Sequence, residues 1–126
     1  MAGEKILIVD DSELVRTAFE DKLSEAGYQV FRASKGEEAL EAVKKELFDL
    51  AYVDLVMPGM DGVETCKAIV EISPKTKVVL ISCYSEKVEE LGEKFIGAGG
   101  EDMFLLKPFS KEKLVETTKE LLKEKA

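Results

Sequence analysis

The chain has 126 residues, of which 45% are hydrophobic and 35% charged, so it is long enough to bury one core and too short for two. Its formal net charge of −8 and the lack of basic runs interleaved with aromatic residues argue against direct contact with nucleic acid. No apolar stretch is long enough to cross a bilayer and no signal-peptide cleavage site follows the N-terminus, so we expect one cytoplasmic domain over residues 1–126 that does not bind membranes.

Five short apolar runs, rich in Val, Ile, Leu and aromatic residues, predict β-strands. They cover residues 5–10, 28–33, 50–54, 77–82 and 103–107. After each run, apolar residues recur at helical spacing, which predicts a helix with one apolar face. These stripes cover residues 14–26, 39–47, 63–70, 88–95 and 114–122. Strand and helix therefore alternate five times.

Polar residues at the predicted helix ends fit the rules for helix caps. Capping boxes are expected at Ser34 with Glu37 and at Asp61 with Glu64. Further candidate N-caps are Ser12, Ser85 and Ser110. Gly27 suits the position just after the end of the first helix.

This alternation predicts an α/β fold in which a parallel sheet carries helices on both faces and the crossovers are right-handed. We expect a doubly wound, flavodoxin-like (βα)5 domain with a five-stranded parallel sheet of order 2-1-3-4-5. In such a sheet all strands end at one edge, and ligands bind beyond that edge where the strand order reverses. The strand ends are therefore the place to look for function.

Four of the five strand ends carry a charged or hydroxyl residue. Asp10 and Asp11 follow the first strand, Asp54 ends the third, Ser82 the fourth and Lys107 the fifth. Each of them, taken alone, is at least as often structural, but their joint occurrence favours a site. Carboxylates about 4 Å apart repel by about 4 kcal/mol per pair at an effective dielectric constant of about 20, so a cation is needed among them. Oxygen ligands, in a chain without histidine, favour Mg²⁺ over zinc.

Mg²⁺, a lysine and a hydroxyl around one aspartate are suited to a phosphoryl group. Phosphoryl transfer depends mainly on positioning and on neutralising charge, and these groups supply both. Asp54 can itself be the nucleophile.

Short motifs at these strand ends resemble those of a known family. They are "ILIVDDS" (6–12), "VDLVMPGMDG" (53–62), "VVLIS" (78–82) and "KPF" (107–109). With these motifs in this order, the chain resembles the receiver domain of bacterial two-component response regulators, in particular the single-domain, chemotaxis-regulator-like type. The resemblance implies that Asp54 accepts a phosphoryl group from a histidine of a sensor kinase or of a phosphotransfer protein. It also implies that Asp11, Asp54 and the backbone carbonyl of Val56 bind Mg²⁺ directly, while Asp10 acts through water.

The resemblance further implies a switch. Lys107 would pair with the phosphoryl oxygens, Ser82 would swing toward the phosphate and Phe104 would turn inward. The face that is remodelled for a downstream protein target comprises helix 86–96, strand 103–107 and helix 111–124. Such a protein acts in phosphorelay signal transduction as a monomer or a phosphorylation-dependent dimer. It is a phosphoacceptor rather than an enzyme, apart from self-catalysed phosphorylation and slow autodephosphorylation.

The chain departs from the family pattern at two places. Cys83 stands where the family usually has Ala, and "GAGGEDMF" (97–104) is longer than usual, in either the helix or the loop. Val56 and Tyr84 flank the acceptor and, being apolar or bulky, suggest a long-lived aspartyl phosphate.

Two other functions stay open at this point. A phosphatase of the haloacid dehalogenase type also uses a strand-end aspartate, but it needs a second Asp where Val56 stands. A degenerate receiver would serve as a constitutive interaction module without phosphorylation.

Overall fold

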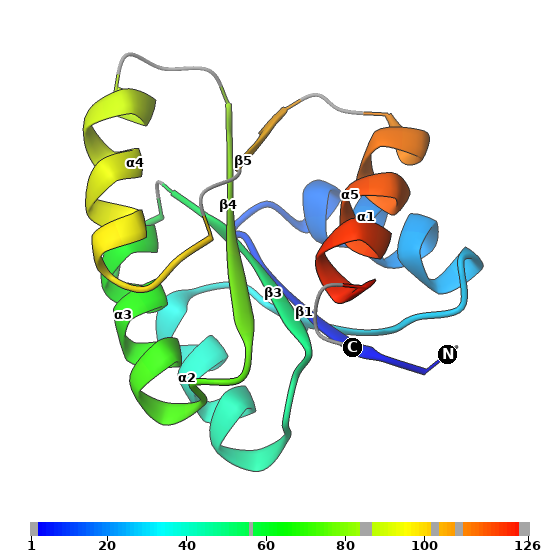
Figure 1. Cartoon of the computed structure of the whole chain (residues 1–126), viewed down its shortest axis with the longest axis horizontal. Helices are drawn as coiled ribbons and strands as arrows, with labels where there is room; N and C mark the ends of the chain where they lie inside the picture. The colour runs from blue at the N-terminus through cyan, green and yellow to red at the C-terminus, as the bar shows by residue number, and fades with distance from the viewer. Residues whose placement is uncertain (1–2, 56, 84–86, 102–103, 108–109, 124–126) are drawn as a thin grey trace.

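The computed structural model describes residues 3–55, 57–83, 87–101, 104–107 and 110–123 (Figure 1). Within these ranges five β-strands alternate with five α-helices, as the sequence predicts. The strands are β1 (Lys5–Val9), β2 (Gln29–Ala33), β3 (Leu50–Asp54), β4 (Lys77–Cys83) and β5 (Phe104–Lys107). The helices are α1 (Glu13–Glu25), α2 (Gly36–Lys45), α3 (Gly62–Ile72), α4 (Lys87–Gly97) and α5 (Lys111–Lys123). The strand limits agree with the predicted ones to within one residue.

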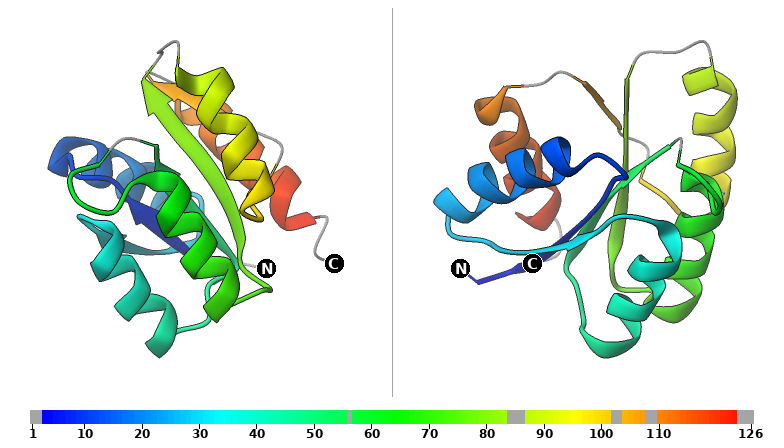
Figure 2. Two further views of the ribbon diagram at one scale, coloured as in Figure 1. Left: turned by 90° about the vertical axis from the view of Figure 1, so that its left-hand side faces the viewer. Right: turned by 180° about the vertical axis from the view of Figure 1, so that it is seen from behind.

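All neighbouring strands pair in parallel, in the order β2-β1-β3-β4-β5, which confirms the predicted doubly wound topology. Helices α1 and α5 cover one face of the sheet, and α2, α3 and α4 cover the other (Figures 1 and 2). The strand order reverses between β1 and β3, so the crevice that binds ligands in such folds lies at their carboxyl ends. In the part of the chain that the structure describes, no helix is both long and apolar enough to span a bilayer.

Alternate residues of the central strands point to opposite faces and enter two separate cores. Ile8 and Tyr52 pack with apolar residues of α1 and α5, whereas Val9 and Val53 pack with residues of α2, α3 and α4. All four side chains are fully buried. Burial on both faces explains why these strands are almost continuously apolar in the sequence.

A buried polar contact ties the middle strand to the last helix. The hydroxyl of Thr118 on α5 donates to the carbonyl of Leu114 at 2.8 Å and lies 2.6 Å from the hydroxyl of Tyr52 on β3. Since Thr118 has one hydroxyl proton, Tyr52 must be the donor in the second contact. Burial raises the pKa of Tyr52 above its ordinary value, and the Phe19 ring of α1 lies 5.3 Å from the Tyr52 ring.

Most of the predicted helix caps are present. The side chain of Ser12 accepts from the backbone of Val15 at 3.4 Å, and Asp61 and Glu64 form the full capping box of α3. Ser110 accepts a hydrogen bond from the backbone of Lys113 at 3.0 Å. Candidate Ser85 lies outside the described residues.

The capping box predicted for the second helix is wrong. The N-cap of α2 is Lys35, which makes no capping hydrogen bond through its side chain. Ser34 instead donates to the carboxylate of Glu38 through both its backbone N–H and its hydroxyl, each at 2.6 Å. These two hydrogen bonds lower the pKa of Glu38. The acidic partner is thus one residue further along than the sequence suggests.

Both α1 and α4 end in a glycine-dependent turn. Gly27 has a φ of 101°, and the amides of Gly27 and Tyr28 donate to the carbonyls of Ser24 and Leu23, the pattern of a Schellman motif. The same pattern recurs at Gly99 (φ 105°) and Gly100, whose amides donate to carbonyls near the end of α4. The described residues after Gly97 therefore belong to the connection rather than to the helix, which answers a question that the sequence leaves open.

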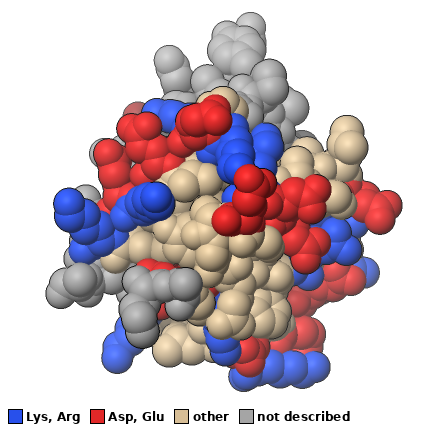
Figure 3. Space-filling view, turned by 90° about the vertical axis from the view of Figure 1, so that its right-hand side faces the viewer, with Lys and Arg blue, Asp and Glu red and all other residues tan. Residues whose placement is uncertain are grey.

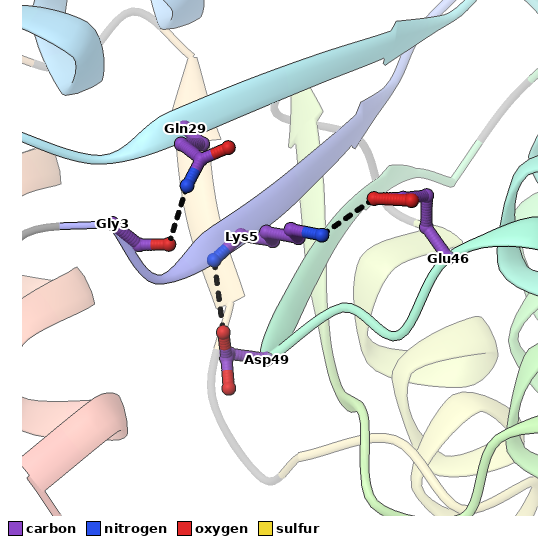
Figure 4. Close-up of polar contacts among 5 residues, drawn as sticks. All are labelled: Gly3, Lys5, Gln29, Glu46 and Asp49. Carbon is purple, nitrogen blue, oxygen red and sulfur yellow. Dashed lines mark hydrogen bonds and ion pairs between the residues drawn. The ribbon is translucent and has the colours of Figure 1, made fainter.

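Polar contacts join the elements at the amino edge of the sheet (Figure 4). The backbone N–H of Lys5 donates to the Asp49 carboxylate at 2.8 Å, and its side-chain Nζ lies 2.6 Å from Oε1 of Glu46. Lys77, at the start of β4, donates through Nζ to the carbonyl of Leu121 at 2.8 Å. The start of β1 and the last turn of α5 thus lie at this edge, away from the carboxyl ends of the strands.

Acidic and basic side chains are interspersed on the side of the molecule that α1 and α5 cover (Figure 3). Two ion pairs illustrate the mixture: Lys111 pairs with Glu25 between the two helices, and Arg32 on β2 lies 3.4 Å from Glu20 on α1. Exposed pairs of this kind contribute little stability individually.

Candidate functional site

Three predicted acidic residues meet at the carboxyl edge of the sheet. Asp10 directly follows β1 and Asp54 ends β3, and the pairing of Val9 with Val53 makes them neighbours across the two strands. One carboxylate oxygen from each of Asp10, Asp11 and Asp54 lies within 4.8 Å of the others. The predicted strand order brings these carboxylates together.

The three carboxylates differ in exposure. Asp10 is 0% and Asp54 6% exposed, while Asp11 faces solvent. Two buried carboxylates at this spacing repel each other in surroundings that screen charge poorly, so the arrangement favours a bound cation. The cluster offers only oxygen ligands, with an open side toward solvent. Such a donor set fits Mg²⁺, which binds one or two carboxylates and retains water molecules.

Asp10 is held through three of its polar groups. Its backbone N–H donates to the carbonyl of Ala33 at 3.1 Å, and its Oδ1 accepts from the backbone N–H of Ser12 at 2.9 Å. Its own carbonyl accepts a hydrogen bond from Nη1 of Arg16 at 2.7 Å. Neither the Ser12 amide nor Arg16 is singled out by the sequence, because both contacts depend on the angle at which α1 leaves β1.

The backbone around Asp54 is also fixed on both sides. The amide of Leu55 donates to the carbonyl of Ile81 on β4, and the amide of Gly62 donates to the carbonyl of Leu55, each at 3.0 Å. A Cβ atom at position 62 would lie 2.5 Å from the Asp54 carbonyl oxygen and 2.7 Å from the Leu55 Cα. Only a glycine therefore allows the start of α3 to approach the end of β3 so closely.

Ser82 lies one residue beyond the pairing of Asp54 with Ile81, and it is 3% exposed. In the last strand pair, Ser82 is opposite Leu106 and Cys83 is opposite Lys107, so the backbone of Lys107 reaches the same edge of the sheet. The side chains of Phe104 and Lys107 lie outside the described part of the structure, as do Val56 and Tyr84. Their roles stay predictions.

A comparison with protein families identifies the chain. Residues 6–119 match the response regulator receiver domain. The chain belongs to this family. Membership agrees with the fold and with the acidic cluster, and it sets aside the alternative of a haloacid-dehalogenase-type phosphatase.

Individual relatives cover nearly the whole receiver. The chemotaxis protein CheY of Thermotoga maritima is 34% identical over 122 residues, which are 96% of this chain and 99% of the relative. The sporulation initiation phosphotransferase F of Bacillus subtilis is 35% identical, over 97% of this chain and 96% of the relative. Among solved structures, the response regulator TrrA of Thermotoga maritima in complex with Mg²⁺-BeF superimposes with a TM-score of 0.81 at 32% identity, over 94% of this chain and 98% of that one.

Proposed function

We propose that residues 1–126 form one receiver domain that takes up a phosphoryl group on Asp54 in a Mg²⁺-dependent reaction. The donor would be a phosphohistidine of a sensor histidine kinase or of a phosphotransfer protein in the cytoplasm. The observation that carries the proposal is the convergence of three carboxylates, two of them buried, at the carboxyl ends of β1 and β3. The Mg²⁺-BeF complex of the relative TrrA supports it.

The residues that would hold the ion are Asp11, Asp54 and the backbone carbonyl of Val56, with Asp10 acting through a water molecule. When bound, Mg²⁺ supplies positive charge that offsets both the carboxylates and the oxygens of the phosphoryl group. Asp10 suits an indirect role because its Oδ1 already accepts the Ser12 amide, which orients the carboxylate.

In the transfer step, a carboxylate oxygen of Asp54 attacks the phosphorus of the donor. A P–O bond forms, the P–N bond of the phosphohistidine breaks, and its electron pair stays on the imidazole nitrogen. Asp54 is 6% exposed, and such burial would limit the access of water to the acyl phosphate. Lys107 would pair with the phosphoryl oxygens and Ser82 would donate its hydroxyl to them. The chain acts as a phosphoacceptor, with self-catalysed phosphorylation and slow autodephosphorylation.

The negative charge of the phosphoryl group would change the conformation of the region that follows β4. Ser82 would move with the β4–α4 connection toward the phosphate and Phe104 would turn inward, which remodels the α4-β5-α5 face. A downstream protein target would bind this face, with the receiver as a monomer or as a phosphorylation-dependent dimer.

Phosphorylation by a small donor tests the proposal. Incubation with acetyl phosphate and Mg²⁺ should add one phosphate, detected by intact mass as an acid-stable, base-labile group. Asp54→Asn should abolish it. Asp61→Asn is the matched control, because Asp61 lies outside the cluster and Asn can replace its capping role. A degenerate receiver would show no phosphate in any of these proteins, and that result would overturn the proposal.

A further inference from the structure

Arg16 reaches back from α1 to the end of β1. Its Nη1 donates to the carbonyl oxygen of Asp10 at 2.7 Å, six residues earlier in the chain. A hydrogen bond from a charged donor is among the stronger ones in proteins. The carbonyl that it holds belongs to the peptide group between the two acidic residues that follow β1.

The guanidinium is not needed to begin the helix. The first turn of α1 is already closed by the backbone N–H of Arg16, which donates to the Ser12 carbonyl at 3.1 Å. The Ser12 hydroxyl caps the helix by accepting from the Val15 amide. The contact of Arg16 with Asp10 is therefore additional to the helix start, and its effect falls on the β1–α1 turn.

The held peptide group controls the direction of Asp11. A peptide unit is planar, so a fixed Asp10 carbonyl also fixes the amide and Cα of Asp11. The Asp10 carboxylate has a separate restraint in the Ser12 amide, whereas Asp11 is an exposed residue whose carboxylate oxygen lies within 4.8 Å of those of Asp10 and Asp54. We propose that Arg16 is a positioning residue, which holds the Asp10–Asp11 peptide so that the Asp11 carboxylate faces Asp54 in a geometry ready for Mg²⁺. This inference rests on the proposed function.

The charge of Arg16, taken alone, would change the Mg²⁺ affinity in the opposite direction to the proposed positioning. A positive guanidinium close to the site repels a divalent cation, so its removal should strengthen Mg²⁺ binding if charge alone matters. Removal should weaken binding if Arg16 positions Asp11. The sign of the change in affinity therefore separates the two roles.

Arg32 provides a matched control. It also contacts α1, through Glu20 at 3.4 Å and the Thr17 hydroxyl at 3.3 Å, but it contacts neither Asp10 nor Asp11 in the described hydrogen bonds and ion pairs. Arg32→Met removes the same charge and leaves an apolar stem of similar length, as Arg16→Met does at its own position.

The experiment measures Mg²⁺ affinity by isothermal titration calorimetry for the wild type, Arg16→Met, Arg16→Lys and Arg32→Met. We expect Arg16→Met to weaken binding about tenfold, which corresponds to about 1.4 kcal/mol. Arg16→Lys should recover part of the loss because the ammonium can still donate one hydrogen bond. Arg32→Met should bind Mg²⁺ as tightly as the wild type or slightly more tightly.

Two further readouts separate positioning from general damage. The backbone amide resonance of Asp11 in the metal-free protein should shift in Arg16→Met and not in Arg32→Met. Urea unfolding without metal reports any loss of stability, and if Arg16→Met does not fold, Arg16→Lys carries the comparison. Equal or tighter Mg²⁺ binding by Arg16→Met than by Arg32→Met overturns the positioning role alone. Absence of Mg²⁺ binding by the wild type overturns the proposed metal site and this inference with it.

Discussion

Replacing Gly62 by alanine adds one methyl group where the end of β3 leaves no room for it. The new Cβ would lie 2.5 Å from the Asp54 carbonyl oxygen and 2.7 Å from the Leu55 Cα, which is 0.9 Å and 0.7 Å short of the 3.4 Å at which ordinary contact begins. Both neighbours are backbone atoms, so no side chain can rotate away. The start of α3 must move, which strains the hydrogen bond from the Gly62 amide to Leu55. Overpacking of this kind costs about 1–3 kcal/mol.

The matched substitution is Gly92→Ala in the interior of α4. A Cβ at position 92 meets nothing within 4 Å. Alanine is favoured over glycine inside a helix by about 0.5–1 kcal/mol. The same added methyl group should therefore destabilise the protein at position 62 and stabilise it at position 92.

Urea unfolding followed by circular dichroism in metal-free buffer gives both changes in unfolding free energy. Gly62→Ala should also slow phosphorylation by acetyl phosphate, because the added Cβ presses on the backbone of Asp54. If Gly62→Ala is as stable as the wild type, or more stable, the close approach of α3 to β3 is refuted.

Three other predictions follow from buried and exposed polar groups. Thr118→Val should lower the free energy of unfolding by about 1–3 kcal/mol, because it leaves the buried Tyr52 hydroxyl without its acceptor. Tyr52→Phe should lower it by only about 1 kcal/mol. Burial raises the pKa of the Cys66 thiol from 9.0 to about 12. Above pH 9 only the unfolded state loses this proton, so stability should fall as the pH rises from 9 to about 12, by up to about 1.4 kcal/mol per pH unit. Glu46→Gln breaks an ion pair with Lys5 whose side chains are each 35% exposed, and should cost less than about 1 kcal/mol.

Each of these predictions has a measurement that can contradict it. In urea unfolding, the double variant of Tyr52 and Thr118 should lose less than the sum of the single losses, and strict additivity would argue against their contact. For Cys66, the slope of unfolding free energy against pH should be smaller in Cys66→Ala, and equal slopes would show that the thiol titrates normally in the fold. If Glu46→Gln lowers the free energy of unfolding by more than about 2 kcal/mol, the contact between Lys5 and Glu46 stabilises the fold more than an exposed ion pair does.

The sequence predicts the sheet well because the signals are local. Each buried strand is a nearly continuous apolar run, and parallel pairing brings strand ends together whatever the details of the loops. The meeting of Asp10, Asp11 and Asp54 follows from that topology, without knowledge of any side-chain contact.

Features that depend on the angles between elements could not be predicted. Ser34 donates to Glu38 rather than capping α2 with Glu37, and the N-cap of α2 is Lys35, one residue later than the spacing suggests. The contact of Arg16 with the Asp10 carbonyl depends on how α1 leaves the sheet. The hydrogen bond between Tyr52 and Thr118 joins residues 66 positions apart, and no periodicity in either segment marks it.

The placement of the first strand and the last helix has a practical consequence. Lys5 begins β1 beside Asp49, and Lys77 binds the Leu121 carbonyl near the end of α5, so the polypeptide enters and leaves the domain at one edge (Figure 1). The acidic cluster lies at the opposite edge. An affinity tag, a surface linker or a fused reporter protein joined before β1 or after α5 would therefore be attached at the edge far from the carboxylates, which leaves the approach of a phosphodonor open.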